Sequence, residues 1–222
     1  INGNIILQLP EGWKSEPTSI NYDFKNKNEE KVLIFNVTPS QKESTGTIEI
    51  DGKKSLISIE YDHILTQTLL PEASAKVVRL NVTTKGKTIG YIKGAGDEVP
   101  TALEQLGYRV VMLDENSLKN DDLAQYDAIV AGIRTYNTNK YMVNVYDRLM
   151  QYVENGGNYI IQYNTNRGLD TKTMAPYPLK LSRDRVTEED AAVTFLAPKH
   201  ALLNTPNKMT KNDFNNWVQE RG

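Results

Sequence analysis

The residue types that perform most enzymatic chemistry are scarce in this chain of 222 residues. Cysteine is absent, which excludes disulfides, thiolate nucleophiles and thiolate metal sites. The two histidines, His63 and His200, are far apart in the sequence, and a site of three histidine ligands is impossible within the chain. Thr165 offers a hydroxyl after an expected strand, but it lacks the flanking glycines of a nucleophile elbow. We therefore expect no catalytic residue and no metal ligand in this chain.

Polar and charged side chains instead gather where buried strands are expected to end. Short apolar runs at residues 88–92, 109–113, 128–133 and 159–163 each precede a polar turn. In a doubly wound parallel sheet, ligands bind in the crevice at the carboxyl ends of the strands. The predicted ligand-binding residues follow these ends and are Asp97, Arg134, Tyr136, Asn137, Asn164, Asn166 and Arg167.

This mixture of amides, aromatic rings and guanidinium groups suits a neutral glycan or another polyol. Planar rings cover the apolar face of a sugar, while amides and arginines hydrogen-bond its hydroxyls. A phosphate is disfavoured because the carboxylate of Asp97 would repel it. The alternative is that the asparagines only end strands and form turns.

The charged segment 182–190 (SRDRVTEED) is expected to be a solvated loop that leads into a strand at 193–196. Either Arg183 or Arg185 of this segment is a further candidate for the crevice. The sequence does not choose between them.

The segment 94–98 (GAGDE) follows an expected strand and opens a helix, as a phosphate-binding loop does. However, Val99 stands at the place of the third glycine of such a loop. Asp97 and Glu98 would also put negative charge where the phosphate binds. A tight turn with Asp97 as the N-cap of the helix is therefore the favoured interpretation.

Two patterns of hydrophobicity divide the chain. Residues 1–84 alternate apolar and polar positions in short runs between turn formers, which predicts an antiparallel β-sandwich of the immunoglobulin-like class. Asp51-Gly52 is the strongest hairpin signal in this part. Over 85–222, continuous apolar runs alternate with helical patterns, such as the apolar stripe within 142–153. This second part is predicted to be an α/β domain of the flavodoxin-like class, with a parallel sheet covered on both faces.

Charge and hydrophobicity exclude two classes of partner. Lys and Arg number 26 against 28 Asp and Glu, a net charge of −2, which argues against a nucleic-acid or anionic-membrane surface. No apolar run approaches the ~20 residues needed to span a bilayer. The chain begins at Ile1 without a methionine and ends on a hydrophilic segment. We therefore expect a fragment of a longer protein, with its α/β domain truncated at the C-terminus.

Five segments occur in order along residues 86–222: GKTIGYIKGAGDEVPTALEQLGYRV, YDAIVAGIRTYN, YVENGGNYIIQYNTNRG, LSRDRVT and WVQERG. Together they resemble the C-terminal region of large bacterial PIG-L/LmbE-like deacetylases. This resemblance implies a fold of the class I glutamine amidotransferase type, near the ThuA-like branch. The preceding part, with LQLPEGW, is similar to sandwich domains appended to secreted bacterial glycosidases.

The resemblance implies that the parent protein is a secreted, metal-dependent sugar de-N-acetylase. Its zinc would be held by an AHPDD-type motif and a later histidine in a deacetylase domain upstream of Ile1, so no catalytic residue transfers to this chain. The amidotransferase-like fold normally carries a cysteine nucleophile after a strand, and cysteine is absent here. We therefore interpret the chain as a non-catalytic accessory region that binds or positions a glycan. Its expected partner is its own upstream deacetylase domain, and its expected location is the periplasm or the extracellular space.

Two alternatives stay open at this point. In the first, the chain is an independent hydrolase acting at the strand-end crevice, with Asp97 as acid/base and Arg134 or Arg167 steadying an anion. In the second, it is a purely structural or dimerisation unit without a ligand.

Overall fold

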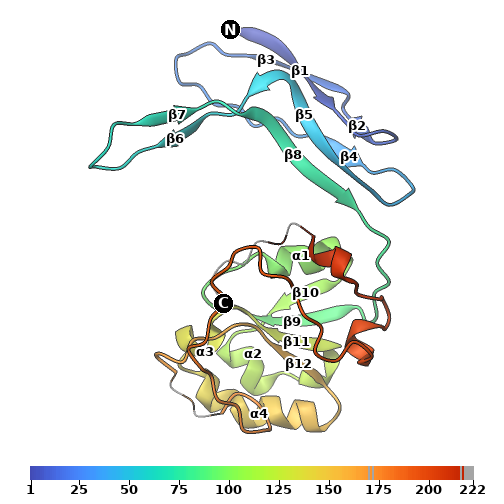
Figure 1. Ribbon diagram of the computed structural model, residues 1–222, viewed down its shortest axis with the longest axis vertical. Coiled ribbons are helices and arrows are strands. Elements are labelled where there is room, and N and C mark those ends of the chain that lie inside the picture. The colour runs from blue at the N-terminus through green and yellow to red at the C-terminus, as the bar shows by residue number, and fades with distance from the viewer. Residues whose placement is uncertain (170, 172, 216, 218–222) are drawn as a thin grey trace. The chain divides into compact units, whose positions relative to one another are not determined.

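The computed structural model describes residues 1–169, 171, 173–215 and 217. Contacts within the chain divide it into two compact units, Ile1–Asn81 and Val82–Gly222 (Figure 1). This division falls close to the boundary predicted between residues 84 and 85.

The first unit is built from antiparallel strands. They are β1 (Asn2–Gln8), β2 (Lys14–Glu16), β3 (Ser19–Asp23), β4 (Asn36–Thr38), β5 (Ser44–Lys54), β6 (Ile57–Ile59), β7 (Gln67–Leu69) and β8 (Glu72–Arg79). Within residues 1–81, all of which are described, one four-stranded sheet has the order β3-β1-β5-β8. The remaining strands form two separate pairs, β2-β4 and β6-β7.

One face of the larger sheet is more buried than the other. In β1 and in the first part of β5, half-buried side chains alternate with exposed ones, as expected for a sheet with one covered face. However, no side chain of residues 1–81 is fully buried. A sandwich encloses a core between two facing sheets, so the immunoglobulin-like class stays a prediction.

The hairpin predicted at Asp51-Gly52 is wrong, because β5 continues through both residues. The pairing of β5 with β8 shifts in register between Glu49 and Lys54, which indicates a bulge. Gly52 has a φ of +62°, a conformation that glycine adopts without steric cost. Bulges and tight hairpins both require such a residue, so the dipeptide does not distinguish them.

The second unit is built around a parallel sheet. Its elements are β9 (Thr88–Ile92), α1 (Val99–Gln105), β10 (Arg109–Met112), α2 (Glu115–Asn120), η1 (Leu123–Gln125), β11 (Ala128–Ala131), α3 (Thr135–Thr138), α4 (Met142–Glu154), β12 (Asn158–Ile161), η2 (Ala201–Leu203) and η3 (Lys211–Phe214). All neighbouring strands are parallel, in the order β10-β9-β11-β12. Doubly wound sheets share this arrangement, in which the first strand lies inside the sheet. The finer flavodoxin-like class stays a prediction.

The strand predicted at 193–196 is not formed, since these residues have no regular secondary structure. Leu196 is 94% exposed. The apolar run is therefore not buried in a sheet. The strand was predicted from apolar composition alone, which does not show whether a segment is buried.

Helices cover both faces of the parallel sheet (Figure 1). On one face, Ile89, Tyr91 and Val130 pack against residues of α1. On the other face, Ile92 and Ile129 pack with residues of α2 and α4. Successive residues of one strand thus enter opposite layers, which explains why these strands are continuously apolar.

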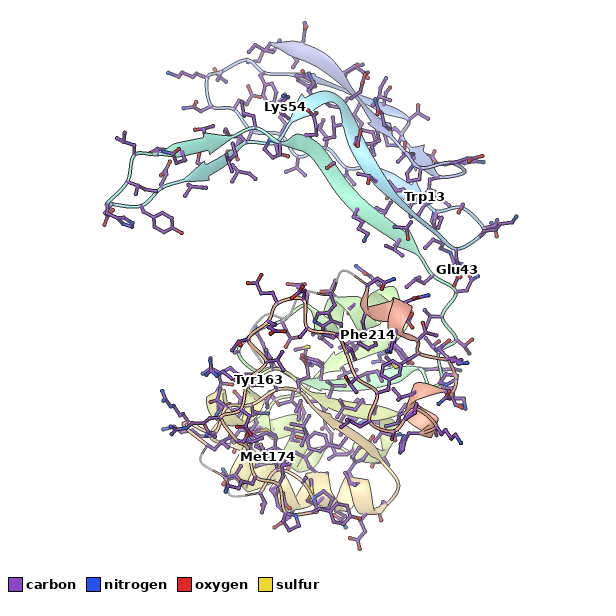
Figure 2. The ribbon with its side chains drawn as sticks, in the orientation of Figure 1. Trp13, Glu43, Lys54, Tyr163, Met174 and Phe214 are labelled. Atoms are coloured by element: carbon purple, nitrogen blue, oxygen red, sulfur yellow. The ribbon has the colours of Figure 1, made fainter. Side chains whose placement is uncertain are left out.

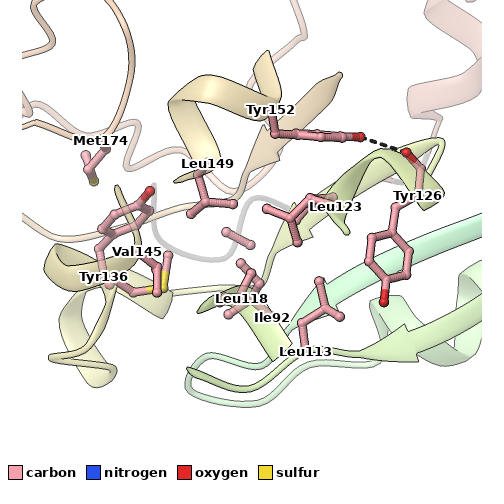
Figure 3. Close-up of a cluster of buried hydrophobic side chains, with 13 residues drawn as sticks. Ile92, Leu113, Leu118, Leu123, Tyr126, Tyr136, Val145, Leu149, Tyr152 and Met174 are labelled. Carbon is pink, nitrogen blue, oxygen red and sulfur yellow. Dashed lines mark hydrogen bonds between the residues drawn. The ribbon is translucent and has the colours of Figure 1, made fainter. Parts of the chain in front are cut away.

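The larger core cluster centres on α4, whose residues Val145 and Leu149 are fully buried beside Leu118 of α2 (Figure 3). Tyr152 is buried at the last turn of α4, and its hydroxyl donates a hydrogen bond of 3.0 Å to the carbonyl of Tyr126. The apolar stripe predicted within 142–153 therefore faces the core.

The longest described helix, α4, has 13 residues. Within the part of the chain that the structure describes, every helix falls short of the length and hydrophobicity that a membrane crossing requires.

Asp127 fixes the start of β9. Its Oδ2 accepts hydrogen bonds from the backbone N–H groups of Lys87 (2.7 Å) and Thr88 (2.9 Å). These hydrogen bonds hold the pKa of the Asp127 carboxyl below its ordinary value of 3.8. A Cβ at Gly86 would lie 2.7 Å from Cγ of Asp127, so the close approach of the chain requires glycine there.

We expect Leu149→Ala to destabilise the second unit by about 2–5 kcal/mol, because it opens a cavity in the core. Val143→Ala, on the same helix but 47% exposed, should change the free energy of unfolding by about 0.5 kcal/mol or less. Denaturant unfolding followed by helical circular dichroism measures both, because the described helices all belong to this unit. Equal effects of the two variants would contradict the placement of Leu149 in the core.

We expect Asp127→Asn to lower the free energy of unfolding at neutral pH and to lose this effect in acid. A carboxyl whose pKa falls on folding stabilises the native state above its unfolded pKa, and this contribution disappears as the pH falls through the folded pKa. Urea unfolding at a series of pH values should show curves for the two proteins that separate above about pH 4 and converge below it. A separation that stays constant down to the lowest pH would contradict the proposed origin.

Candidate functional site

The polar turns after β11 and β12 lie side by side, because these two strands are neighbours in the sheet. The backbone N–H of Arg134 donates a 2.6 Å hydrogen bond to the carbonyl of Tyr163. The backbone N–H of Tyr136 donates one of 3.0 Å to Oδ1 of Asn164. Residues far apart in the sequence are thus joined at the carboxyl ends of the strands, as the parallel order predicts.

A cavity of about 440 Å³ opens beside these turns, and we call it the strand-end cavity. Its lining residues are Arg134, Tyr163, Asn164, Thr165, Asn166, Arg167, Ser182, Arg183, Asp184 and Arg185. Figure 2 shows the side chains of this region and labels Tyr163. Four of the seven predicted ligand-binding residues line the cavity: Arg134, Asn164, Asn166 and Arg167. The other three, Asp97, Tyr136 and Asn137, are not among its lining residues.

Asp97 acts inside the fold. Its carboxylate accepts hydrogen bonds from the hydroxyl of Tyr91 (2.6 and 2.8 Å) and from the backbone N–H groups of Val99 (3.0 Å) and Ile133 (3.2 Å). Gln162 donates a 3.0 Å hydrogen bond from Nε2 to the Tyr91 hydroxyl. One carboxylate therefore links the turn after β9 to β9 itself and to the turn after β11. This geometry explains why Asp97 does not face the cavity.

Burial raises the pKa of Tyr91, and its hydrogen bond to the negative Asp97 raises it further. The phenol of Tyr91 therefore stays protonated and remains a donor to Asp97 at all ordinary pH values.

The turn after β9 lies too close to the turn after β11 for larger residues. A Cβ at Gly94 would lie 2.0 Å from the carbonyl oxygen of Ile133, and one at Gly132 would lie 2.6 Å from the Tyr91 hydroxyl. The glycine-rich segment 94–98 thus serves close backbone contact, as its interpretation as a tight turn predicts. The N-cap of α1 is Glu98, one residue after the predicted Asp97.

Tyr136 and Asn137 were predicted to contact a ligand, but both have structural roles instead. Tyr136 is only 3% exposed, and its hydroxyl lies 2.8 Å from that of Tyr159 in the core. Burial raises the pKa of Tyr136 to about 12. The Asn137 amide is occupied by backbone groups, since it accepts from the N–H of Thr165 (2.9 Å) and donates to the carbonyls of Thr165 and Arg167 (3.0 Å each).

Asn164 combines both roles. It lines the cavity, but it is only 7% exposed, and its amide also donates to the carbonyl of Gln162 at 2.8 Å. The alternative interpretation was that asparagines only shape the turns. It describes Asn137 fully, and it describes the hydrogen bonds of Asn164 to the backbone but not its place in the cavity lining.

The segment 182–185 supplies lining residues that the sequence did not assign. Both Arg183 and Arg185 line the cavity, whereas the sequence left open which of them would do so. Leu181 packs against the larger core cluster, and this contact positions the residues that follow it. The two arginines of this short segment were the only sequence signal for a place in the cavity. However, a charged segment of this kind is equally typical of a solvated loop.

A second cavity of about 270 Å³ lies at the opposite edge of the sheet, among residues that precede β11 and β12. Its one arginine, Arg148, is already bound through hydrogen bonds to the carbonyls of Lys119 (2.8 Å) and Asp121 (2.5 Å). The guanidinium group of this cavity is therefore already occupied by the protein itself.

No group of three or more His, Cys, Asp or Glu side chains within the described residues is arranged to hold a metal ion. His200 accepts a hydrogen bond of 3.2 Å at Nδ1 from the N–H of Leu202 and caps the short turn η2.

Comparison with protein-family models, curated proteins and solved structures found no match to this chain.

We expect Asp97→Ala to destabilise the second unit by about 1–3 kcal/mol or more, because the Tyr91 hydroxyl and two backbone N–H groups lose their acceptor. Asp147→Ala, at an exposed position of α4, is the matched control and should stay within about 0.5 kcal/mol. Denaturant unfolding followed by helical circular dichroism provides the comparison. Unchanged stability of Asp97→Ala would contradict a structural role for this carboxylate.

Proposed function

We propose that the second unit is a non-catalytic saccharide-binding domain and that its ligand occupies the strand-end cavity. The observation that carries this proposal is the chemistry of the cavity lining, which combines amide, hydroxyl, aromatic and guanidinium side chains. The cavity volume of about 440 Å³ falls within the range of small-molecule sites, roughly 300–1,000 Å³.

Several lining side chains are available to a ligand with many hydroxyls. Tyr163 is 48% exposed, so its ring offers an apolar surface to a sugar face. Asn166 and Ser182 provide amide and hydroxyl groups, and an amide can donate and accept hydrogen bonds at once. The turn that carries Tyr163 and Asn166 is braced by hydrogen bonds of Asn137 and Asn164, which limits the ordering cost of binding.

We further propose that the chain is an accessory region of a secreted PIG-L/LmbE-like sugar de-N-acetylase, in the periplasm or outside the cell. The resemblance of residues 86–222 motivates this part of the proposal, and a lining suited to polyols supports it. Zinc would be held by a preceding deacetylase domain. The described residues of this chain do not fit zinc, because they include no cluster of three suitable ligands.

An independent hydrolase is a weaker candidate. Its general acid or base would be Asp97, and the carboxylate of Asp97 is already occupied by Tyr91, Val99 and Ile133. A catalytic group must reach the proton that it transfers, and Asp97 is not among the cavity lining residues.

We expect Tyr163→Ala and Asn166→Ala each to weaken saccharide binding roughly two- to tenfold, which corresponds to about 0.5–1.5 kcal/mol for one contact. A glycan array identifies the saccharide that binds best, and calorimetric titration then measures its affinity for each variant. Tyr177→Ala is the matched control, since Tyr177 is 79% exposed and does not line the cavity.

The melting temperatures of the Tyr163 and Asn166 variants should stay close to that of the unchanged protein. Asn164→Ala should instead lower the melting temperature, because its amide bonds the backbone of Tyr136 and Gln162. Failure of the array to detect any saccharide, or equal weakening by Tyr177→Ala, would refute the proposed site.

A further inference from the structure

The strand-end cavity carries an excess of positive charge. Its lining holds four guanidinium groups and one carboxylate, that of Asp184, for a formal charge of +3. The complete chain has a net charge of −2. The positive charge is therefore local to this cavity and does not follow from a generally basic chain.

The four arginines, Arg134, Arg167, Arg183 and Arg185, are not neutralised by other parts of the described chain. None of their guanidinium groups forms an ion pair with a described residue. By contrast, both ends of the Arg148 guanidinium are bound by backbone carbonyls. Four cations beside a single carboxylate repel one another, and a bound anion would reduce this repulsion.

We infer that the ligand of the strand-end cavity is an acidic saccharide, whose anionic group is a carboxylate or a sulfate ester. This inference rests on the proposed function and refines its ligand class from a neutral polyol to a charged one. The charge of Asp97 does not oppose an anion in this cavity. Its carboxylate is bound to Tyr91 and to backbone N–H groups, and Asp97 is not among the cavity lining residues.

The arginines reach the cavity from three separate segments. Arg134 and Arg167 follow β11 and β12, while Arg183 and Arg185 follow the core contact of Leu181. The planar fork of a guanidinium group matches the paired oxygens of a carboxylate or a sulfate. The anionic group would be bound by these forks, and Tyr163 and Asn166 would contact the sugar ring.

The test compares two pairs of ligands by calorimetric titration of the complete chain at neutral pH. The first pair is trigalacturonate and its methyl ester, which keeps the ring hydroxyls but loses the charge. The second pair is a sulfated galactan oligosaccharide and its desulfated form. Within at least one pair, the charged member should bind at least about tenfold more tightly, a difference of about 1.4 kcal/mol. The pair with the larger difference identifies the anionic group as a carboxylate or a sulfate.

Arg183→Gln and Arg185→Gln should each weaken binding of the charged ligand by about tenfold or more, and added salt should weaken it further through screening. Arg183→Lys should recover part of the affinity, because it keeps the charge but not the fork. The control is Arg109→Gln, which removes the same group from the amino-terminal end of β10, at the opposite edge of the sheet. This control should leave the affinity unchanged.

The remaining outcomes would contradict either this inference, the proposed saccharide site, or both. Equal binding of charged and uncharged members in both pairs would overturn this inference and leave the proposed saccharide site intact. Absence of binding by any saccharide would overturn both. Free inorganic sulfate that binds as tightly as the acidic saccharide would overturn the saccharide specificity in both statements. An equal loss in Arg109→Gln would place the anion outside the cavity and overturn the inference.

Discussion

The carboxylate of Asp97 is the constraint on which the carboxyl end of the parallel sheet depends. It accepts hydrogen bonds from a buried tyrosine hydroxyl and from two backbone N–H groups, Val99 and Ile133. Gln162 joins the same network through Tyr91. This network is partly buried, and hydrogen bonds shielded from water strengthen one another when every member has a partner. The close backbone approach at Gly94 and Gly132 brings these partners within reach.

At the carboxyl ends of the strands, some polar side chains bond the protein itself and others remain available to a ligand. The carboxylate of Asp97 and the amide of Asn137 are occupied by the protein itself, and Tyr136 is buried in the core. The arginines remain at the cavity, together with Tyr163 and Asn166. Hydrogen bonds within the protein thus fix the turns after the strands, and the side chains that stay available lie beside them at the cavity. Groups held in place before binding lower the ordering cost of a ligand.

The two units differ in how they are stabilised. All of the buried hydrophobic side chains of the described chain belong to the second unit, on the two faces of its parallel sheet. The first unit has strands with alternating half-buried and exposed positions but no fully buried side chain. Since opening free energy follows buried apolar contact, we infer that the strands of the first unit open more readily than β9 or β11.

The sequence by itself determined the elements whose burial follows from local periodicity. Strand β9 and the core-facing side of α4 agree with their predictions, because continuous and helical apolar patterns encode which face is buried. The parallel order also brings Arg134 beside the residues that follow β12. Only the tertiary structure decided the direction of Asp97, since the same carboxylate could face solvent or neighbouring N–H groups. It also placed Arg183 and Arg185, because a segment without regular structure is positioned by its core contact at Leu181 and not by periodicity.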